Sequence, residues 1–111
     1  HGAALSVHRA DFGHNDRALT DGRTSGEIKL MVVGSRPVGV SIVGPQAGEL
    51  IGLWALAISS RLKLSAIAGM VLPYPTLGEV SKRATGAYFS PKLFANPALR
   101  LFVRLVQRLI P

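Results

Sequence analysis

Hydrophobic and polar positions alternate over two short segments in the first half of the chain. The runs begin at Glu27 and at Val38 and are separated by Gly34-Ser35-Arg36-Pro37, a sequence typical of a turn. A period of two residues indicates half-buried strands, so the pattern predicts a β-hairpin. A further strand is expected from Leu5 to Ala10. The predicted inward positions are Ile28, Leu30 and Val32 in one strand and Val38, Val40 and Ile42 in the other.

From Gln46 the period becomes helical and predicts a helix to about Ser60 that packs on the hairpin. A short helix is expected over Ala66 to Val71 after Ser65, another from Thr76 to Thr85, and a last one from Ala98 to Ile110. The segments 11–25 and 86–97 are expected to be loops, the first with a turn at 15–18. The fold class is therefore α+β, an antiparallel sheet with helices packed on one face. The stripe of the first helix comprises Ala47, Leu50, Ile51, Trp54, Ala55 and Ile58.

The composition combines a hydrophobic fraction of 48% with a net charge of +7 over 111 residues. The mean hydropathy is +0.31, which favours a surface buried against another domain or a second copy. A membrane span over residues 37–60 is the rival interpretation. We disfavour it because Gly44-Pro45 would interrupt the helix and Glu49 would lie near the bilayer centre.

The chain contains no cysteine, so it forms no disulfide, cysteine-ligated metal site or thiol nucleophile. This composition suits a cytoplasmic protein. We expect a single domain from a longer protein, and we interpret residues 1–3 as a tag or excision remnant. His8 and His14 are too far apart for a helical metal pair, and no metal site is predicted.

The segment from Pro73 to Glu79 is the strongest candidate for chemistry. Tyr74 lies between two prolines, and Glu79 follows it by five residues. The same segment fits a capping box, in which Thr76 caps a helix and Glu79 closes the box. Both interpretations stay open for Glu79, and for Tyr74 the alternative is a packing residue at an interface.

Several spaced motifs together resemble a known family. They are Gly26-Glu27-Ile28-Lys29, a hairpin, Gly44 with Ala47-Gly48-Glu49-Leu50-Ile51, and Pro75-Thr76-x-x-Glu79. In this order they resemble the C-terminal dimerisation domain of the pyridine nucleotide-disulfide oxidoreductases, which include glutathione reductase, dihydrolipoamide dehydrogenase and mercuric reductase. The resemblance covers residues 4–88, and residues 89–111 form a C-terminal extension.

The resemblance implies a homodimer whose subunits bind FAD and NAD(P)H in two upstream domains. Tyr74 and Glu79 would then act at the partner subunit's site, and Pro73, Tyr74 and Pro75 would lie near the partner's flavin. The interface is expected at Ala47, Leu50, Ile51 and Trp54. The chain has neither a GxGxxG fingerprint nor a cysteine pair, so alone it is expected to bind no cofactor and to be inactive.

One residue departs from the disulfide reductase pattern. The family has histidine where this chain has Tyr74. A phenol with a pKa near 10 donates a hydrogen bond but does not exchange protons at neutral pH as imidazole does. Mercuric reductases resemble the chain in having Pro-Tyr here, although they carry a C-terminal cysteine pair that it lacks. The electron acceptor stays open between a disulfide, a metal ion and a quinone, as does the choice between NADH and NADPH.

The last predicted helix is basic and amphipathic. Arg100, Arg104 and Arg108 recur every four residues opposite Leu101, Phe102, Leu105, Val106 and Leu109. We expect this helix to pack on the domain with a solvated arginine face; an anionic membrane or an acidic partner is the alternative. The alternative function for the whole chain is thus a non-catalytic interaction domain, membrane-peripheral through this helix. Nucleic acid binding is not expected, because no stacking aromatics or recognised motif accompany the arginines.

Overall fold

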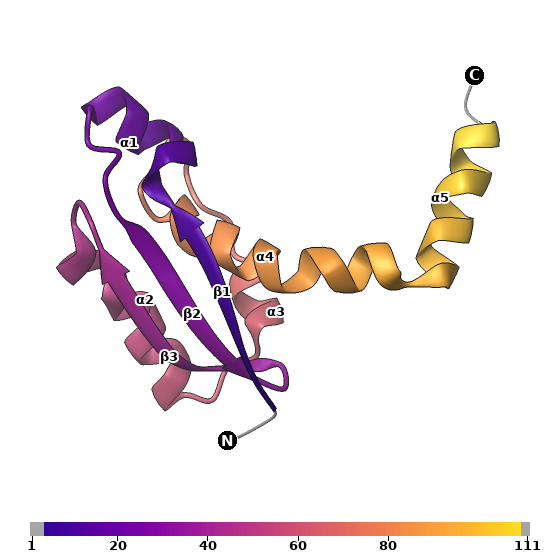
Figure 1. Cartoon of the computed structure of the whole chain (residues 1–111), viewed down its shortest axis with the longest axis horizontal. Coiled ribbons are helices and arrows are strands. Elements are labelled where there is room, and N and C mark those ends of the chain that lie inside the picture. The colour runs from indigo at the N-terminus through magenta and orange to yellow at the C-terminus, as the bar shows by residue number, and fades with distance from the viewer. Residues whose placement is uncertain (1–3, 110–111) are drawn as a thin grey trace.

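A computed structural model describes residues 4–109, apart from the side chains of residues 93–95. Three antiparallel strands form a sheet in the order β1 (Leu5–Asp11), β2 (Glu27–Val33), β3 (Arg36–Val43) (Figure 1). Leu5 pairs with Val33 and Glu27 pairs with Val43, with a register shift between Met31 and Val32. The predicted hairpin is confirmed with a tighter turn, in which Gly34 takes the left-handed conformation at φ 63°.

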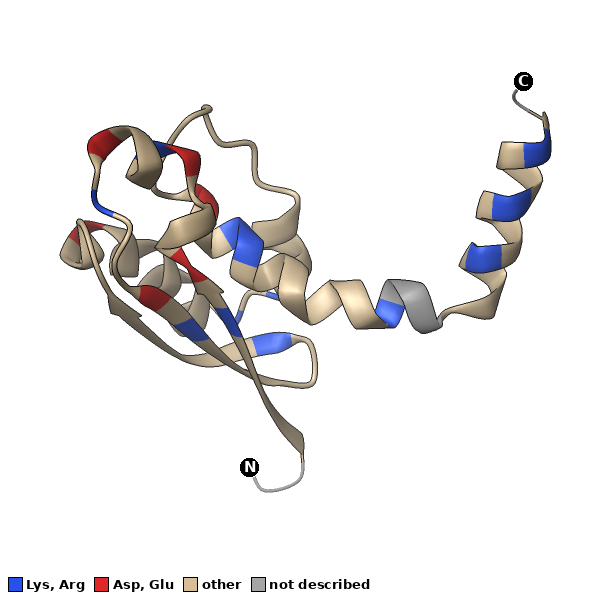
Figure 2. Cartoon of the chain, turned by 45° about the horizontal axis from the view of Figure 1, so that its top comes forward, with Lys and Arg blue, Asp and Glu red and all other residues tan. Residues whose placement is uncertain are grey.

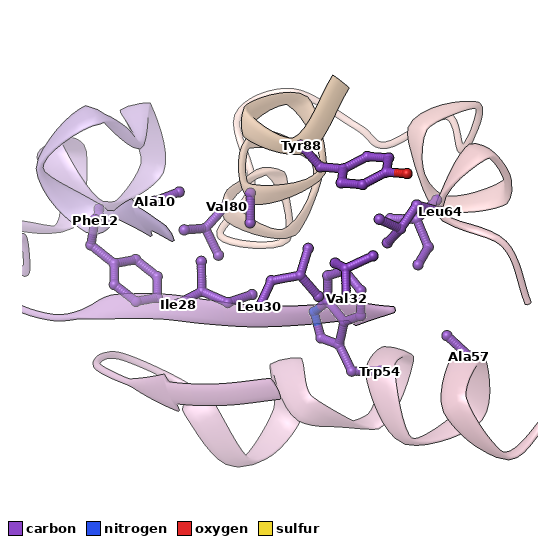
Figure 3. Close-up of a cluster of buried hydrophobic side chains, with 13 residues drawn as sticks. Ala10, Phe12, Ile28, Leu30, Val32, Trp54, Ala57, Leu64, Val80 and Tyr88 are labelled. Atoms are coloured by element: carbon purple, nitrogen blue, oxygen red, sulfur yellow. The ribbon is translucent and has the colours of Figure 1, made fainter. Parts of the chain in front are cut away.

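The buried face of β2 forms the centre of the core. Ile28, Leu30 and Val32 are fully buried, as the alternation predicts, and helices pack against them. These helices are α2 (Ala47–Ser59), α3 (Leu64–Ala68) and α4 (Glu79–Ala95). Figure 3 shows Trp54 of α2 and Val80 and Tyr88 of α4 directed into this cluster. The α+β class with helices on one face of the sheet is confirmed.

The polar segment after β1 was predicted to be a loop, but it contains two short helical elements. It forms a 3₁₀ turn, η2 (Phe12–His14), and a short helix, α1 (Asp16–Asp21). Asn15 caps α1 by accepting a 2.9 Å hydrogen bond from the Ala18 amide, and its side-chain amide donates to the Thr76 carbonyl at 3.1 Å. Asn15 therefore joins this segment to the residues that precede α4.

Helix α4 continues well beyond its predicted end at Thr85, so the expected loop over residues 86–95 is wrong. Tyr88 explains the continuation, because it is buried and donates a 2.7 Å hydrogen bond to the Gly34 carbonyl. The Lys92 amine lies 4.1 Å from the centre of the Tyr88 ring and donates to its hydroxyl. These contacts favour the helix despite Gly86 and the internal Pro91. The predicted boundary after residue 88 lies inside a helix and stays a prediction.

Helix α3 begins one residue before the predicted cap. Leu64 is its first residue, and Lys63 precedes it without a side-chain capping bond. Leu64 and Ile67 are buried, so packing against the core, rather than Ser65, fixes this short helix.

Helix α5 (Pro97–Leu109) projects away from the sheet (Figure 1). The Asn96 side chain caps it by accepting a 3.0 Å hydrogen bond from the Ala98 amide. No residue of α5 is buried, so the expected packing of its apolar face on the domain is not found within residues 4–109. The predicted end at Ile110 and the proposed remnant at residues 1–3 lie outside the described residues. Across the described range, no helix is both long and apolar enough to cross a membrane.

Candidate functional site

The segment between α3 and α4 presents Tyr74 on the surface. The Tyr74 side chain is 70% exposed, and the peptide bond between Tyr74 and Pro75 is cis. The Tyr74 hydroxyl donates a 2.6 Å hydrogen bond to Oδ2 of Asp16, the first residue of α1. Two segments 58 residues apart in the sequence therefore meet at this hydroxyl.

Glu79 closes one half of the predicted capping box. Its Oε2 accepts a 3.2 Å hydrogen bond from the Thr76 amide. The Thr76 hydroxyl instead donates to the Pro73 carbonyl at 2.9 Å, which fixes the turn that carries Tyr74. Glu79 thus holds the start of α4, and its catalytic role stays a prediction.

A hollow of about 130 Å³ lies beside these residues. Arg83 borders it and donates a 2.7 Å hydrogen bond from Nη1 to the His14 carbonyl. The hollow offers a phenol donor, two carboxylates and a guanidinium, a combination that can orient a polar group. Its lining residues are His14, Asn15, Asp16, Tyr74, Glu79 and Arg83.

Asp16 controls the ionisation of Tyr74. The pKa of the Tyr74 hydroxyl is raised above its ordinary value of 10.0, first by the hydrogen bond to Asp16, then by the Asp16 charge, desolvation and the Glu79 charge. Ionisation would place a phenolate against a carboxylate and lose the hydrogen bond. Tyr74 therefore stays protonated at neutral pH and acts as a hydrogen-bond donor.

The replacement Asp16→Asn should lower the pKa of Tyr74 toward its ordinary value, because it removes the charge that opposes ionisation. The measurement is the absorbance of tyrosinate near 295 nm during an alkaline titration, in a protein with two tyrosines. Asp21→Asn is the matched control, since Asp21 lies in the same helix and pairs with Arg17 at 3.1 Å. Titration curves that coincide for Asp16→Asn and the unchanged protein would contradict the assignment.

Asp16, His14 and Arg83 were missed by sequence reasoning. Asp16 falls in the segment predicted as a loop, and nothing in the local sequence indicates its contact with Tyr74. The only available signal was the Asn15-Asp16 pair, which is typical of helix caps. His14 also hydrogen-bonds Asp11 at 2.6 Å, and this bond is the main reason that the pKa of Asp11 is lowered.

The two histidines that the structure describes, His8 and His14, have different neighbours. His8 is half-buried, with its ring edge-on to Tyr88 at 5.3 Å between centres. Its pKa is lowered, first by burial and then by the charge of Lys92. Among the residues that the structure describes, no group of three or more His, Cys, Asp or Glu side chains is arranged to hold a metal ion.

The solvent-exposed face of helix α2 is not the face that carries most of the predicted hydrophobic stripe. Trp54 is fully buried in its own chain, and its indole donates a 2.9 Å hydrogen bond to the Ser81 hydroxyl. Its placement at the interface is therefore corrected to the core. Ala47, Leu50 and Ile51 are half-buried. Of the exposed face, the hydrophobic stripe included only Ala55. This face consists mainly of small residues: Gly48, Gly52, Ala55, Leu56 and Ser59.

The chain is similar to known proteins in both its sequence and the order of its helices and strands. Residues 1–85 match the family model described as the pyridine nucleotide-disulphide oxidoreductase, dimerisation domain. A mercuric reductase of Acidithiobacillus ferrooxidans is 45% identical over 74 residues, which cover 65% of this chain and 14% of that protein. A mitochondrial dihydrolipoyl dehydrogenase of Caenorhabditis elegans is 32% identical over 97 residues, covering 86% of this chain and 20% of that protein.

The solved structures show the same fold. The flavoprotein disulfide reductase RclA of Escherichia coli, solved as a Cu(II) complex, superimposes with a TM-score of 0.73 at 21% identity. The match covers 77% of this chain and 20% of that one. The chain spans a fifth or less of the two relatives named above. On the extent of these matches, the chain belongs to the pyridine nucleotide-disulphide oxidoreductase family and carries its dimerisation domain.

Proposed function

We propose that this chain pairs the subunits of a homodimeric, cytoplasmic, FAD-dependent NAD(P)H oxidoreductase and completes the partner subunit's active site. The main observation in support is the position of Tyr74, which is 70% exposed and hydrogen-bonded to Asp16 beside a surface hollow. A tyrosine that packs within its own chain would bury its ring. An exposed ring on a fixed hydroxyl is instead available to a neighbouring subunit. The match to an oxidoreductase family disfavours a non-catalytic interaction domain.

The flavin and nicotinamide belong to domains upstream of this chain. The chain has no cysteine and no nucleotide fingerprint, so we expect it to bind neither cofactor alone. The exposed side chains of Pro73, Tyr74 and Pro75 fit a role as the cover over the partner's flavin. In such an enzyme the flavin relays electrons from the nicotinamide to the acceptor; this chain supplies a donor hydroxyl and a carboxylate.

The protonated state of Tyr74 favours a particular role at that site. Its raised pKa keeps the hydroxyl protonated, so it does not act as a base that removes a proton. At the partner's site its single proton would turn from Asp16 to a thiolate or a metal-bound thiolate and stabilise that charge. The similarity to a mercuric reductase agrees with this role. We therefore propose a parent closer to mercuric reductases, with a dihydrolipoyl dehydrogenase-like parent as the second candidate.

The outward face of α2 supplies the first test of the dimer. An added side chain at Gly52 meets nothing within 4 Å in this chain. Gly52→Arg should therefore leave the subunit folded, with a gain in helix propensity of about 1 kcal/mol, and should prevent a partner from approaching α2. Sedimentation equilibrium should show a dimer for the unchanged chain and a monomer for Gly52→Arg, a loss of tenfold or more in association.

Gly86→Arg is the matched control. Gly86 is also a helical, exposed glycine with open space around its added side chain, but it lies on α4, away from the proposed interface. It should leave the dimer intact. A monomeric unchanged chain at high concentration, or equal effects of the two arginines, would contradict the proposed surface.

A further inference from the structure

The apolar face of α5 has no partner within the described chain. Leu101, Phe102 and Leu109 are 61%, 62% and 80% exposed, and Leu105 is 49% exposed. Packing against α4 does not cover them. A hollow of about 590 Å³ lies between α4 and the opposite side of α5, so the exposed apolar face points away from the domain. It is lined by Gly86, Phe89 and Ser90 of α4 and by Leu99, Arg100, Val103, Arg104 and Gln107 of α5.

The polar face of α5 carries only positive charge. Arg100, Arg104 and Arg108 follow one another along one side of the helix, as Figure 2 shows in blue. No Asp or Glu occurs after Glu79 in the sequence, whereas six Lys or Arg residues do. Arg104 follows Leu101 by three residues and Arg108 follows Leu105 by three, which places both arginines at the border of the apolar face.

We propose that α5 binds the surface of an anionic membrane, lying in its plane with the apolar face inserted and the arginines at lipid phosphates. The four exposed apolar residues span an arc of roughly 100° at 3.6 residues per turn, the width typical of the apolar face of an amphipathic helix. A cationic polar face with an apolar face is typical of helices that lie in the interface. Arginine suits phosphate because its planar fork can form two hydrogen bonds.

Length and geometry agree with this placement. The 13 residues of α5 extend about 20 Å, less than the roughly 30 Å of a bilayer core, so α5 lies on the membrane instead of crossing it. Because the hollow and α4 lie on the other side of α5, the sheet would remain in solution. A second copy is disfavoured as the occupant, since two α5 helices would bring arginines of the same charge together.

Vesicle flotation with the complete 111-residue chain tests the proposal. The probes are phosphatidylcholine vesicles with and without 40% phosphatidylglycerol. Binding should be at least tenfold stronger with phosphatidylglycerol and should weaken as salt increases. Arg104→Gln with Arg108→Gln should weaken it by roughly fivefold per arginine, and Phe102→Gln with Leu105→Gln should abolish it.

Control variants distinguish binding through α5 from a general effect of the charge or hydrophobicity of the whole chain. Arg23→Gln with Lys63→Gln removes the same charge from exposed positions on the domain, and Val71→Gln replaces an apolar side chain that is 92% exposed. All should bind like the unchanged chain. Circular dichroism verifies that each variant retains its helices, which is expected because no α5 residue is buried.

Three outcomes would overturn the proposal. One is equal binding by the α5 variants and their controls. The second is no binding to anionic vesicles together with a dimer that the Phe102 and Leu105 replacements abolish, which would make a second copy the occupant. The third is vesicle binding by the 111-residue chain that disappears in a longer protein containing it, which would mean that another domain covers α5. None of these outcomes depends on whether the chain completes an oxidoreductase site.

Discussion

The replacement Trp54→Ala should lower the free energy of unfolding of the domain by about 3–5 kcal/mol. Trp54 is fully buried between the sheet and α4, so the replacement leaves a large cavity. It also leaves the Ser81 hydroxyl without the indole donor 2.9 Å away. Domains of this size are stable by about 5–15 kcal/mol, so a large share of the stability is lost. Urea denaturation followed by circular dichroism measures the change.

Leu56→Ala is the matched control for that measurement. Leu56 lies in the same helix but is 62% exposed, so its replacement should change the free energy of unfolding by less than about 0.5 kcal/mol. Both variants are measured at concentrations where the chain is monomeric. A loss below about 1 kcal/mol for Trp54→Ala would contradict the placement of Trp54 in the core.

Local pattern predicted the elements whose burial follows a simple period. In β2 every second side chain is buried, and the sequence alternates accordingly, so the strand and its inward face could both be predicted. The hairpin followed from Gly34 between two alternating runs, because glycine takes the left-handed conformation at no steric cost. The helical stripe likewise predicted α2 to within a residue at each end.

Features that depend on distant contacts could not be predicted in this way. Gly86 and Pro91 indicate a break, but Tyr88 reaches the Gly34 carbonyl in the hairpin turn and stabilises a continuous α4. The contact between Asp16 and Tyr74 joins two segments that both look like loops. Trp54 fits the apolar stripe, but the stripe alone does not show whether a given side chain is buried within its own chain or against a partner subunit.

The replacement Tyr74→Phe should reduce turnover on the order of 10²-fold in the longer flavoprotein that we propose contains this chain, by analogy with the loss of one donor at a developing negative charge. Substrate binding should change little, because the ring remains. The replacement should also leave the melting temperature nearly unchanged, since the side chain is 70% exposed. Steady-state kinetics with a disulfide and with a thiol-bound metal measure the effect on both acceptor classes.

Two further variants distinguish the donation of a hydrogen bond by Tyr74 from the positioning of the site by Asp16 and Glu79. Asp16→Asn keeps the Tyr74 hydroxyl but weakens its anchor, so turnover should fall less than in Tyr74→Phe. Glu79→Gln keeps an oxygen that can accept the Thr76 amide bond at the start of α4. It should leave stability intact, and a fall in turnover would then assign Glu79 a role beyond capping. Unchanged turnover for Tyr74→Phe with both acceptors would reduce Tyr74 to a surface residue.

Mixed dimers test whether Tyr74 acts on the partner rather than on its own subunit. In the longer flavoprotein that we propose, a Tyr74→Phe subunit is combined with a subunit in which the cysteine pair expected upstream is replaced, so each homodimer is impaired. If Tyr74 acts across a two-fold axis, the hybrid has one intact site, formed by the tyrosine of one subunit and the cysteines of the other. Random mixing should then restore about a quarter of the unchanged activity. If Tyr74 acts within its own subunit, no site in the hybrid is intact and no activity returns, so recovery requires that this chain serves the opposite subunit.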